Sequence, residues 1–400
     1  MTQSGGAVRW LIPVLPSVTG LTEVDVARLC RFEDVLRGLL ARWPSNPCDS
    51  VAERGARLAH IRRDLAASGD LALAVPGVDG GVGRSPALQV LLQFVCGYYD
   101  ADLRDSSGLG HGRLIALHGS AETRNRWLPQ LLAGKLAGIA ITEAHGGSHV
   151  HDTASVAVER SDGSWSLTGT KTWISRLNEA AVFAVFFKDP AGCLTVGVID
   201  AAADGLHRHS IRPAGLSGWA WGELRLEQVL MRPDEILGSP GEGMGLLREH
   251  FAHYRPLVAA TALGAAAAVH DRVSAHLRAR RRAGIITDLR DNALMSLGTA
   301  FARINSALLM TFAAQRLALD GHEDAGLWGC AAKAYGVDTA YESASELALL
   351  TGAAGFTASS PLVKTLGDLA ALRYADGIHD SLYRSAGRAL TITGPAPGTR

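Results

Sequence analysis

Apolar residues recur at spacings of three to four through the first third of the chain. Between residues 21 and 40 they stand at Leu21, Val24, Leu29, Phe32, Val35, Leu36, Leu39 and Leu40. This period predicts amphipathic helices up to about Gly138, interrupted where proline and glycine gather at residues 43–49 and 76–83. Thr22 followed by Asp25 predicts the cap that starts the first of these helices. We expect this region to form a helical bundle.

The period of the apolar residues changes to two from Thr153 onward, and Asp162-Gly163 predicts a turn between the first two strands. Strand-like runs follow at residues 181–187, 194–199 and 223–229. Short strands separated by turn residues predict a small antiparallel barrel or sandwich.

Beyond Met244 the chain is rich in alanine and leucine, which favour helix. Long helices are predicted near residues 258–282, 292–319, 325–350 and 361–390, and four such helices typically form an antiparallel bundle. The predicted fold class is therefore α+β and multidomain. We expect an N-terminal helical domain at residues 1–138, a middle antiparallel β-barrel or sandwich at residues 139–243, and a C-terminal four-helix bundle with a short tail at residues 244–400.

Charge and cysteine content argue against several classes of protein. The chain of 400 residues has 39 Lys+Arg and 39 Asp+Glu, a balance that provides no field to attract nucleic acid or an acidic membrane. No apolar run is expected to reach bilayer-spanning length, and residues 1–7 lack the pattern of a signal peptide. The five cysteines stand singly, which predicts neither a disulfide framework nor a zinc site. We expect a cytoplasmic protein with no membrane or nucleic-acid partner.

Two short segments carry the candidate chemistry. The first, TEAHGGS at residues 142–148, is expected to end a helical region, and its small residues, such as Gly147, let backbone approach a ligand closely. The second, GTKTWIS at residues 169–175, is a predicted strand in which Trp173 and Ser175 share one face by period-two alternation. Together the two segments look like a flavin-binding site, and we refer to them below as the cradle.

Further motifs occur in the order found in the acyl-CoA dehydrogenase superfamily. HGSAETR and RWLP, at residues 118–129, are similar to "HGSEEQK…WLP", and the cradle is similar to "TEPGAGSD" and "GxKxWIT". Arg255-Pro256 resembles the family's "RP", and TGAAGFT at residues 351–357 resembles "LGGYGYT". The resemblance covers nearly the whole chain. It implies an FAD-dependent oxidoreductase with helical, β and four-helix domains that assembles as a homodimer or homotetramer.

The resemblance also implies roles for individual residues. Thr142 would bind the flavin pyrimidine edge and Ser148 the pyrophosphate, while Trp173 would flank the isoalloxazine and Ser175 would reach N5. Arg280, in a segment similar to "RxQFG", would contact a cofactor phosphate across a subunit interface. From the residues alone, a tryptophan such as Trp173 is more often a core aromatic, and residues such as Thr142 and Ser148 are more often turn or cap residues.

The resemblance places a catalytic base at Asp376. LRYADGI at residues 372–378 stands where many family members have the glutamate of "YEGT", which removes the α-proton of an acyl thioester. Other relatives carry their glutamate directly before Arg255, where this chain has Tyr254. Arg255 is then a neighbour that orients Asp376 or balances its charge. Aspartate is shorter than glutamate by roughly 1.5 Å, and the alternative is an ordinary acid in a loop between helices.

Several positions depart from the family pattern. Polar or stacking partners of the dinucleotide are replaced at His149, Ala283, Leu349 and Ile378. Trp219 and Trp221 stand where the family's chain follows the substrate pocket, and with Tyr254 they are the candidate pocket residues. Two indoles two residues apart are expected on one strand face, where they either shape the acyl cavity or cover the sheet. The loop histidines are not expected to bind a metal.

The function predicted from this resemblance is FAD-dependent α,β-dehydrogenation of an acyl thioester. The acyl carrier is either coenzyme A or a carrier protein, and the departures indicate a specialised substrate such as one of secondary metabolism. The electron acceptor stays open. Two alternatives also stay open: a flavin-dependent oxidase or monooxygenase, and a non-redox protein of the same fold with weak or no flavin binding.

Overall fold

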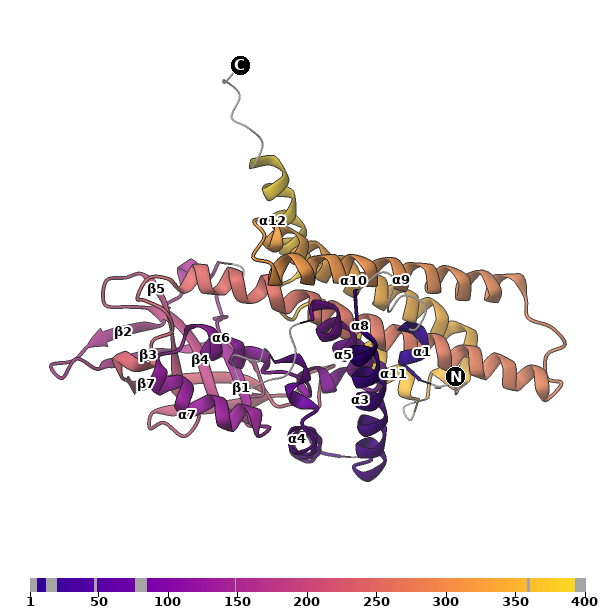
Figure 1. Cartoon of the computed structure of the whole chain (residues 1–400), viewed down its shortest axis with the longest axis horizontal. Coiled ribbons are helices and arrows are strands. Elements are labelled where there is room, and N and C mark those ends of the chain that lie inside the picture. The colour runs from indigo at the N-terminus through magenta and orange to yellow at the C-terminus, as the bar shows by residue number, and fades with distance from the viewer. Residues whose placement is uncertain are drawn as a thin grey trace, which may run out of the picture. The chain divides into compact units, whose positions relative to one another are not determined.

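The computed structural model describes residues 6–11, 20–46, 49–75, 85–147, 149–357 and 360–392. These residues belong to two compact units, both drawn in Figure 1. The helical unit comprises Met1–Val14, Gln93–Ala101 and Phe251–Arg400, and the sheet unit comprises Leu15–Leu92 and Asp102–His250. The three-domain division of the chain stays a prediction.

Helices with polar caps open the sheet unit. They are α3 (Glu23–Arg42), α4 (Val51–Ala67), α6 (Arg113–His118) and α7 (Ala121–Leu132), and α5 (Pro86–Tyr99) continues into the helical unit. Thr22 and Asp25 cap α3 reciprocally: the Thr22 hydroxyl accepts from the Asp25 amide, and the Asp25 carboxylate accepts from the Thr22 amide. The cap predicted from the sequence is therefore confirmed.

One mixed sheet forms the centre of the sheet unit. Its strands are β1 (Leu136–Ala140), β2 (Val156–Glu159), β3 (Trp165–Ser175), β4 (Ala180–Lys188), β5 (Leu194–Asp200), β6 (Leu206–Ile211) and β7 (Trp221–Met231). The order is β1-β4-β2-β3-β7-β6, with β5 paired to β4 outside this path. β1 and β2 run parallel to β4, whereas the other pairs are antiparallel.

β1 corrects one expectation. The segment before the cradle was expected to be helical, but residues 136–140 form a strand in register with β4. Four of its five residues are buried. A short, fully apolar run of this kind has no alternation, so periodicity alone does not distinguish a buried strand from a buried helix. The first cradle segment thus follows a strand.

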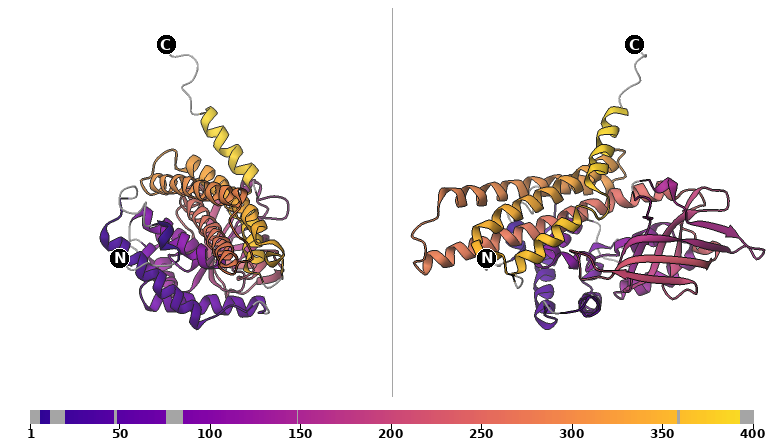
Figure 2. Two further views of the ribbon diagram at one scale, coloured as in Figure 1. Left: turned by 90° about the vertical axis from the view of Figure 1, so that its right-hand side faces the viewer. Right: turned by 180° about the vertical axis from the view of Figure 1, so that it is seen from behind.

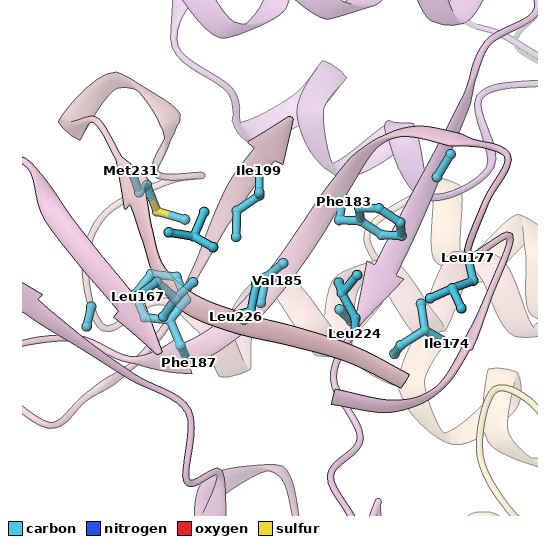
Figure 3. Close-up of a cluster of buried hydrophobic side chains, with 14 of the residues drawn as sticks. Leu167, Ile174, Leu177, Phe183, Val185, Phe187, Ile199, Leu224, Leu226 and Met231 are labelled. Carbon is cyan, nitrogen blue, oxygen red and sulfur yellow. The ribbon is translucent and has the colours of Figure 1, made fainter. Parts of the chain in front are cut away.

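A cluster of apolar side chains from β3, β4, β5 and β7 forms the core of this unit (Figure 3). Leu167, Phe183, Phe187 and Leu224 are each fully buried within it. β4 is buried at seven of its nine positions. The core therefore fixes β3, which carries the second cradle segment, between two neighbouring strands.

The helical unit is built from long helices. They are α8 (Gly243–Arg282), which begins in the sheet unit, α9 (Asp291–Leu319), α10 (Ala325–Ala348), α11 (Pro361–Leu372) and α12 (His379–Ile392). α9 and α10 lie side by side, as both views of Figure 2 show. The fourth predicted helix is interrupted between α11 and α12, because Asp376 (φ 56°) and Gly377 (φ 110°) adopt left-handed backbone conformations that end a helix. The predicted fold class is confirmed in its order of helical, sheet and helical regions.

Helix α9 contradicts the expectation that no segment reaches bilayer-spanning length. By length and composition alone, Asp291–Leu319 could cross a membrane. One such helix argues only weakly for a membrane, because helices that pack in a protein core pass the same test. Its buried residues, among them Ala300, Ile304 and Ala307, belong to the helical unit.

Candidate active site

A buried ion pair joins the two cradle segments. Lys171, fully buried on β3, donates from Nζ to Glu143 Oε1 at 2.7 Å and to the Ile141 carbonyl oxygen at 3.2 Å. The Thr172 amide donates to the Thr142 carbonyl oxygen at 2.8 Å. The segments that the sequence singled out are therefore in contact, and Thr142 lies beside the strand that carries Trp173.

Glu143 is held as a carboxylate by several donors. Besides Lys171, it accepts hydrogen bonds from the Ala154 amide at 2.7 Å and from the amide and hydroxyl of Ser155 at 3.0 and 2.6 Å. Burial alone would raise the pKa of Glu143, but these donors together lower it to about 2. This pair was not predicted, because Lys171 stands between two threonines and its partner Glu143 lies 28 residues away along the chain.

Trp173 does not pack in the core. Its side chain is 65% exposed and its φ is 60°, and the β3–β7 register shifts between Lys171 and Ile174. This bulge breaks the period-two alternation of β3. The expectation that Trp173 and Ser175 share a strand face by alternation is therefore wrong. The interpretation of Trp173 as a core aromatic is also wrong. A bulky exposed residue in a left-handed conformation is costly and is more typical of functional sites.

Within the first cradle segment, the backbone at Gly147 lies close to the Thr142 side chain. A Cβ at Gly147 would lie 3.0 Å from Thr142 Cγ2 and 3.1 Å from its Oγ1. A larger residue at this position would crowd the Thr142 side chain and require it to shift. Ser148 lies outside the described residues, so its predicted contact with the pyrophosphate stays a prediction.

The two candidate pocket tryptophans do not share a strand face. Trp219 lies in the turn before β7, is fully buried, and donates from its indole nitrogen to the Asp102 carbonyl oxygen at 3.0 Å. Trp221 begins β7 and donates to the Leu216 carbonyl oxygen at 2.9 Å. The expectation of one strand face is wrong because the strand begins only at Trp221. Trp219 packs as a core residue of the sheet unit.

In the helical unit, Asp376 stands in the turn between α11 and α12. Arg255 of α8 donates from Nε to the Asp376 carbonyl oxygen at 3.2 Å and from Nη1 to Cys330 Sγ at 3.1 Å. Lys333 of α10, fully buried, donates from Nζ to the Gly377 carbonyl oxygen at 2.8 Å. Arg255 is therefore a neighbour of Asp376, as predicted, but it contacts the backbone rather than the carboxylate.

A second set of contacts holds the two ends of this turn. Asp338 of α10 accepts from Arg373 Nε at 2.9 Å, lies 2.9 Å from His379 Nδ1, and accepts from the Tyr383 hydroxyl at 3.3 Å. Lys333 and Asp338 thus fix the turn from one helix. Neither residue was predicted, because the groups that Lys333 and Asp338 contact are distant from them along the chain.

Burial lowers the pKa of Lys333 to about 7, and the nearby Asp376 charge only partly opposes this shift. Within the residues that the structure describes, the Asp376 carboxylate itself makes no hydrogen bond or ion pair, and the side chain is partly exposed. It is held in place by its backbone and remains available for another group.

The remaining predicted residues lie on α8. Tyr254 is buried beside Arg255, and Arg280 lies in the last turn, where it is partly buried. Arg280 Nε is buried without a hydrogen-bond partner among the described residues. Their roles stay predictions.

Comparison with known proteins decides the family. Residues 138–229 match the middle domain of acyl-CoA dehydrogenase, and residues 241–391 match its C-terminal domain. The chain belongs to the acyl-CoA dehydrogenase family. A probable acyl-CoA dehydrogenase of Mycobacterium tuberculosis is 26% identical over 367 residues, which cover 88% of this chain and 88% of that protein. The predicted class of oxidoreductase, acting on CH–CH groups, is thereby confirmed.

Solved structures with the same fold include other acyl-CoA dehydrogenases. A glutaryl-coenzyme A dehydrogenase in complex with glutaryl-CoA aligns with a TM-score of 0.84 at 22% identity, over 95% of this chain and 98% of that one. The prolyl acyl carrier protein oxidase AnaB aligns with a TM-score of 0.79 at 18% identity, over 92% and 99%. At these identities the likeness concerns the fold.

The cradle of this acyl-CoA dehydrogenase family member fits a flavin by its donor chemistry. The exposed Trp173 ring supplies a flat apolar surface, Thr142 and Ser175 supply hydroxyls, and a Cβ at Gly146 would meet nothing within 4 Å. The apolar departures are surface positions: Leu349 is 80% exposed and Ile378 43% exposed.

Proposed function

We propose that the chain is an FAD-dependent dehydrogenase that introduces an α,β double bond into an acyl thioester, with Asp376 as the base. The observation that carries the assignment is the Asp376-Gly377 turn. Arg255 and Lys333 bind the two successive backbone carbonyls, and the carboxylate is left without a partner among the described residues. A general base requires such a group, fixed in position and free to accept a proton.

The cradle would hold the cofactor. Thr142, Gly147 and Ser148 would contact the flavin and its phosphates, and Trp173 and Ser175 would lie against the ring. Arg280 would bind a phosphate. FAD, when bound, supplies the acceptor for the hydride that leaves the substrate β-carbon.

The chain's own residues would control the α-proton. Asp376 accepts the proton from the α-carbon onto its carboxylate, and the electron pair of the broken C–H bond moves into the new double bond as the β-hydrogen leaves. Arg255 and Lys333 hold the backbone at the Asp376 and Gly377 carbonyls and so fix where the carboxylate stands. Because aspartate reaches less far than glutamate, the α-carbon must lie closer to the turn.

The substrate is proposed to be a specialised acyl group, on coenzyme A or on a carrier protein, in secondary metabolism. The likeness in fold to a prolyl acyl carrier protein oxidase supports the carrier-protein version and keeps an oxidase in view. The acyl cavity would be shaped by Trp221 and Tyr254. Trp219, which is fully buried, would act indirectly by supporting the residues that line the cavity. The electron acceptor would be another protein in a dehydrogenase and oxygen in an oxidase.

A cytoplasmic homodimer or homotetramer is proposed as the working form. Large apolar side chains are exposed in the helical unit, on α9 and in the segment after α10. They are Leu294, Met295, Phe301, Leu309, Leu349 and Phe356. Exposed apolar residues in this number are typical of protein interfaces.

The absorption spectrum of purified protein after incubation with FAD tests the proposal. Visible flavin bands that bleach anaerobically on addition of an acyl thioester are the expected result. Absence of flavin bands would remove both redox functions. The same acyl group presented on coenzyme A and on a carrier protein distinguishes the two carriers, and oxygen consumption during turnover would favour the oxidase.

A further inference from the structure

A buried arginine contacts the last hydroxyl of the cradle. Arg176 Nη1 donates to Ser175 Oγ at 2.7 Å. A guanidinium group has donors and no acceptor, so Ser175 Oγ must accept this bond. The hydroxyl hydrogen of Ser175 is then left to donate to a different group.

Arg176 is itself fixed by a carboxylate. It is 2% exposed, and its Nε donates to Asp105 Oδ2 at 2.6 Å, while Nη2 forms an ion pair with the same oxygen. Both partners are buried, so the guanidinium group has little freedom to turn away from Ser175. The φ of Arg176 is 59°, a strained conformation that places this side chain in the interior.

Further arginines keep Asp105 ionised. Arg104 Nε lies 3.9 Å from Asp105 Oδ2, and the buried Arg62 donates to the Asp105 and Gly108 carbonyl oxygens. Burial alone would raise the pKa of Asp105, but the charges of Arg176, Arg104 and Arg62 outweigh burial and hold it below its ordinary value. The Arg176–Asp105 pair therefore stays charged.

We propose that Arg176 is a positioning residue that fixes the Ser175 hydroxyl as a hydrogen-bond donor to bound FAD. The inference rests on the proposed function, in which Ser175 lies against the flavin. A donor fixed before the reaction withdraws electron density from the ring atom that it binds, and so favours reduction of the ring more than a hydroxyl free to rotate. Arg176 thus raises the reduction potential of the bound flavin through Ser175.

The test is a double-mutant cycle read by the potential of bound FAD. Arg176→Met/Asp105→Asn removes the donor and one charge of each sign, which avoids leaving a buried carboxylate unpaired. We expect this variant and Ser175→Ala each to lose about tenfold in preference for reduced over oxidised FAD, which for a two-electron couple corresponds to about 30 mV. The combined triple variant should show no further fall, because Arg176 acts through Ser175.

Two further proteins keep the result interpretable. Arg176→Lys, which retains a cationic donor beside Asp105, should fall between the wild type and the double variant. Arg225→Met, on the exposed face of β7, should leave the potential unchanged. Wild-type potential in Arg176→Met/Asp105→Asn, or additive losses in the triple variant, would overturn the inference while leaving the proposed function intact. A wild-type protein that takes up no FAD would overturn both.

Discussion

Lys333 of α10 donates a 2.8 Å hydrogen bond to the carbonyl oxygen of Gly377, the residue that follows the proposed base Asp376. Lys333 is fully buried, and its partner is a neutral carbonyl rather than a carboxylate. Burial therefore lowers the pKa of Lys333 to about 7. The backbone on which Asp376 stands is thus held by an interior lysine instead of by local turn contacts alone.

Replacing Lys333 with methionine is expected to lower both stability and turnover. The Gly377 carbonyl would lose a buried partner, which costs about 1–3 kcal/mol, and a turn displaced by about 1 Å costs on the order of a hundredfold in kcat. Urea denaturation and steady-state kinetics measure the two effects. Arg388→Met, an exposed cation on α12, is the control and should change neither by much. Wild-type kcat in Lys333→Met would show that the turn holds its position without the lysine.

Asp376→Asn is expected to abolish bleaching of bound flavin by the acyl thioester, slowing it by about a hundredfold or more, because the amide cannot accept the α-proton. FAD binding and the unfolding free energy should stay near wild type, since the carboxylate makes no bond to another described residue. Stopped-flow absorbance measures the rate. Asp380→Asn, an exposed acid in the first turn of α12, serves as the matched control. Bleaching at the wild-type rate would remove Asp376 from the mechanism.

Lys171→Met should destabilise the sheet unit by about 3–5 kcal/mol, because Glu143 would remain buried without its cation. The same change should weaken FAD binding, since the ion pair that joins the two cradle segments is lost. Chemical denaturation and a flavin-binding titration report the two effects. Lys135→Met, at an exposed position of the same unit, is expected to stay within about 0.5 kcal/mol of wild type. A similar small effect in Lys171→Met would contradict a structural role for the pair.

Trp173→Gly is expected to weaken FAD binding by about tenfold while leaving the unfolding free energy within about 1 kcal/mol of wild type. FAD binding weakens because the contact with the Trp173 ring is lost. The unfolding free energy changes little because glycine adopts φ 60° without strain, which offsets the greater entropy of glycine in the unfolded chain. The contrast is Trp165→Gly on the same strand, whose ring packs on Phe187 and whose loss should cost about 2 kcal/mol. Equal destabilisation by both changes would identify Trp173 as a structural residue.

Stability is expected to fall steadily as pH falls from about 6.5 to 2. Burial and then the Lys333 charge lower the pKa of His379 from 6.5 to about 4, so between these values the unfolded chain binds the extra proton. Glu143, with a pKa of about 2 against 4.5, loses its contribution as pH falls through the range below 4.5. Urea midpoints across this range measure the slope. His379→Gln should flatten the part between pH 6.5 and 4 alone, and an unchanged slope would contradict the assignment.

Local sequence signals predicted the elements that local physics forms. The Thr22–Asp25 cap, the helices near residues 292–319 and 325–350, and the strands from Thr153 onward all follow from spacings within a few residues. The fourth helix of the bundle was predicted too long because alanine and leucine favour helix on both sides of the turn. Tertiary contacts from α8 and α10 hold the left-handed turn at Asp376 that interrupts it.

The sequence by itself determined the order of helical, sheet and helical regions, because periodicity is encoded within short stretches. The roles of the cradle segments and of Asp376 came from the resemblance to the family and stay predictions. Only the tertiary structure decided that β1 is a strand beside β4, that Trp173 is exposed on a bulge, and that buried cations have distant partners. Lys171 meets Glu143, and Lys333 meets Gly377, only once the chain has folded. A buried charge is tolerated only where a partner from another segment compensates its lost hydration, and no local pattern specifies which segment that is.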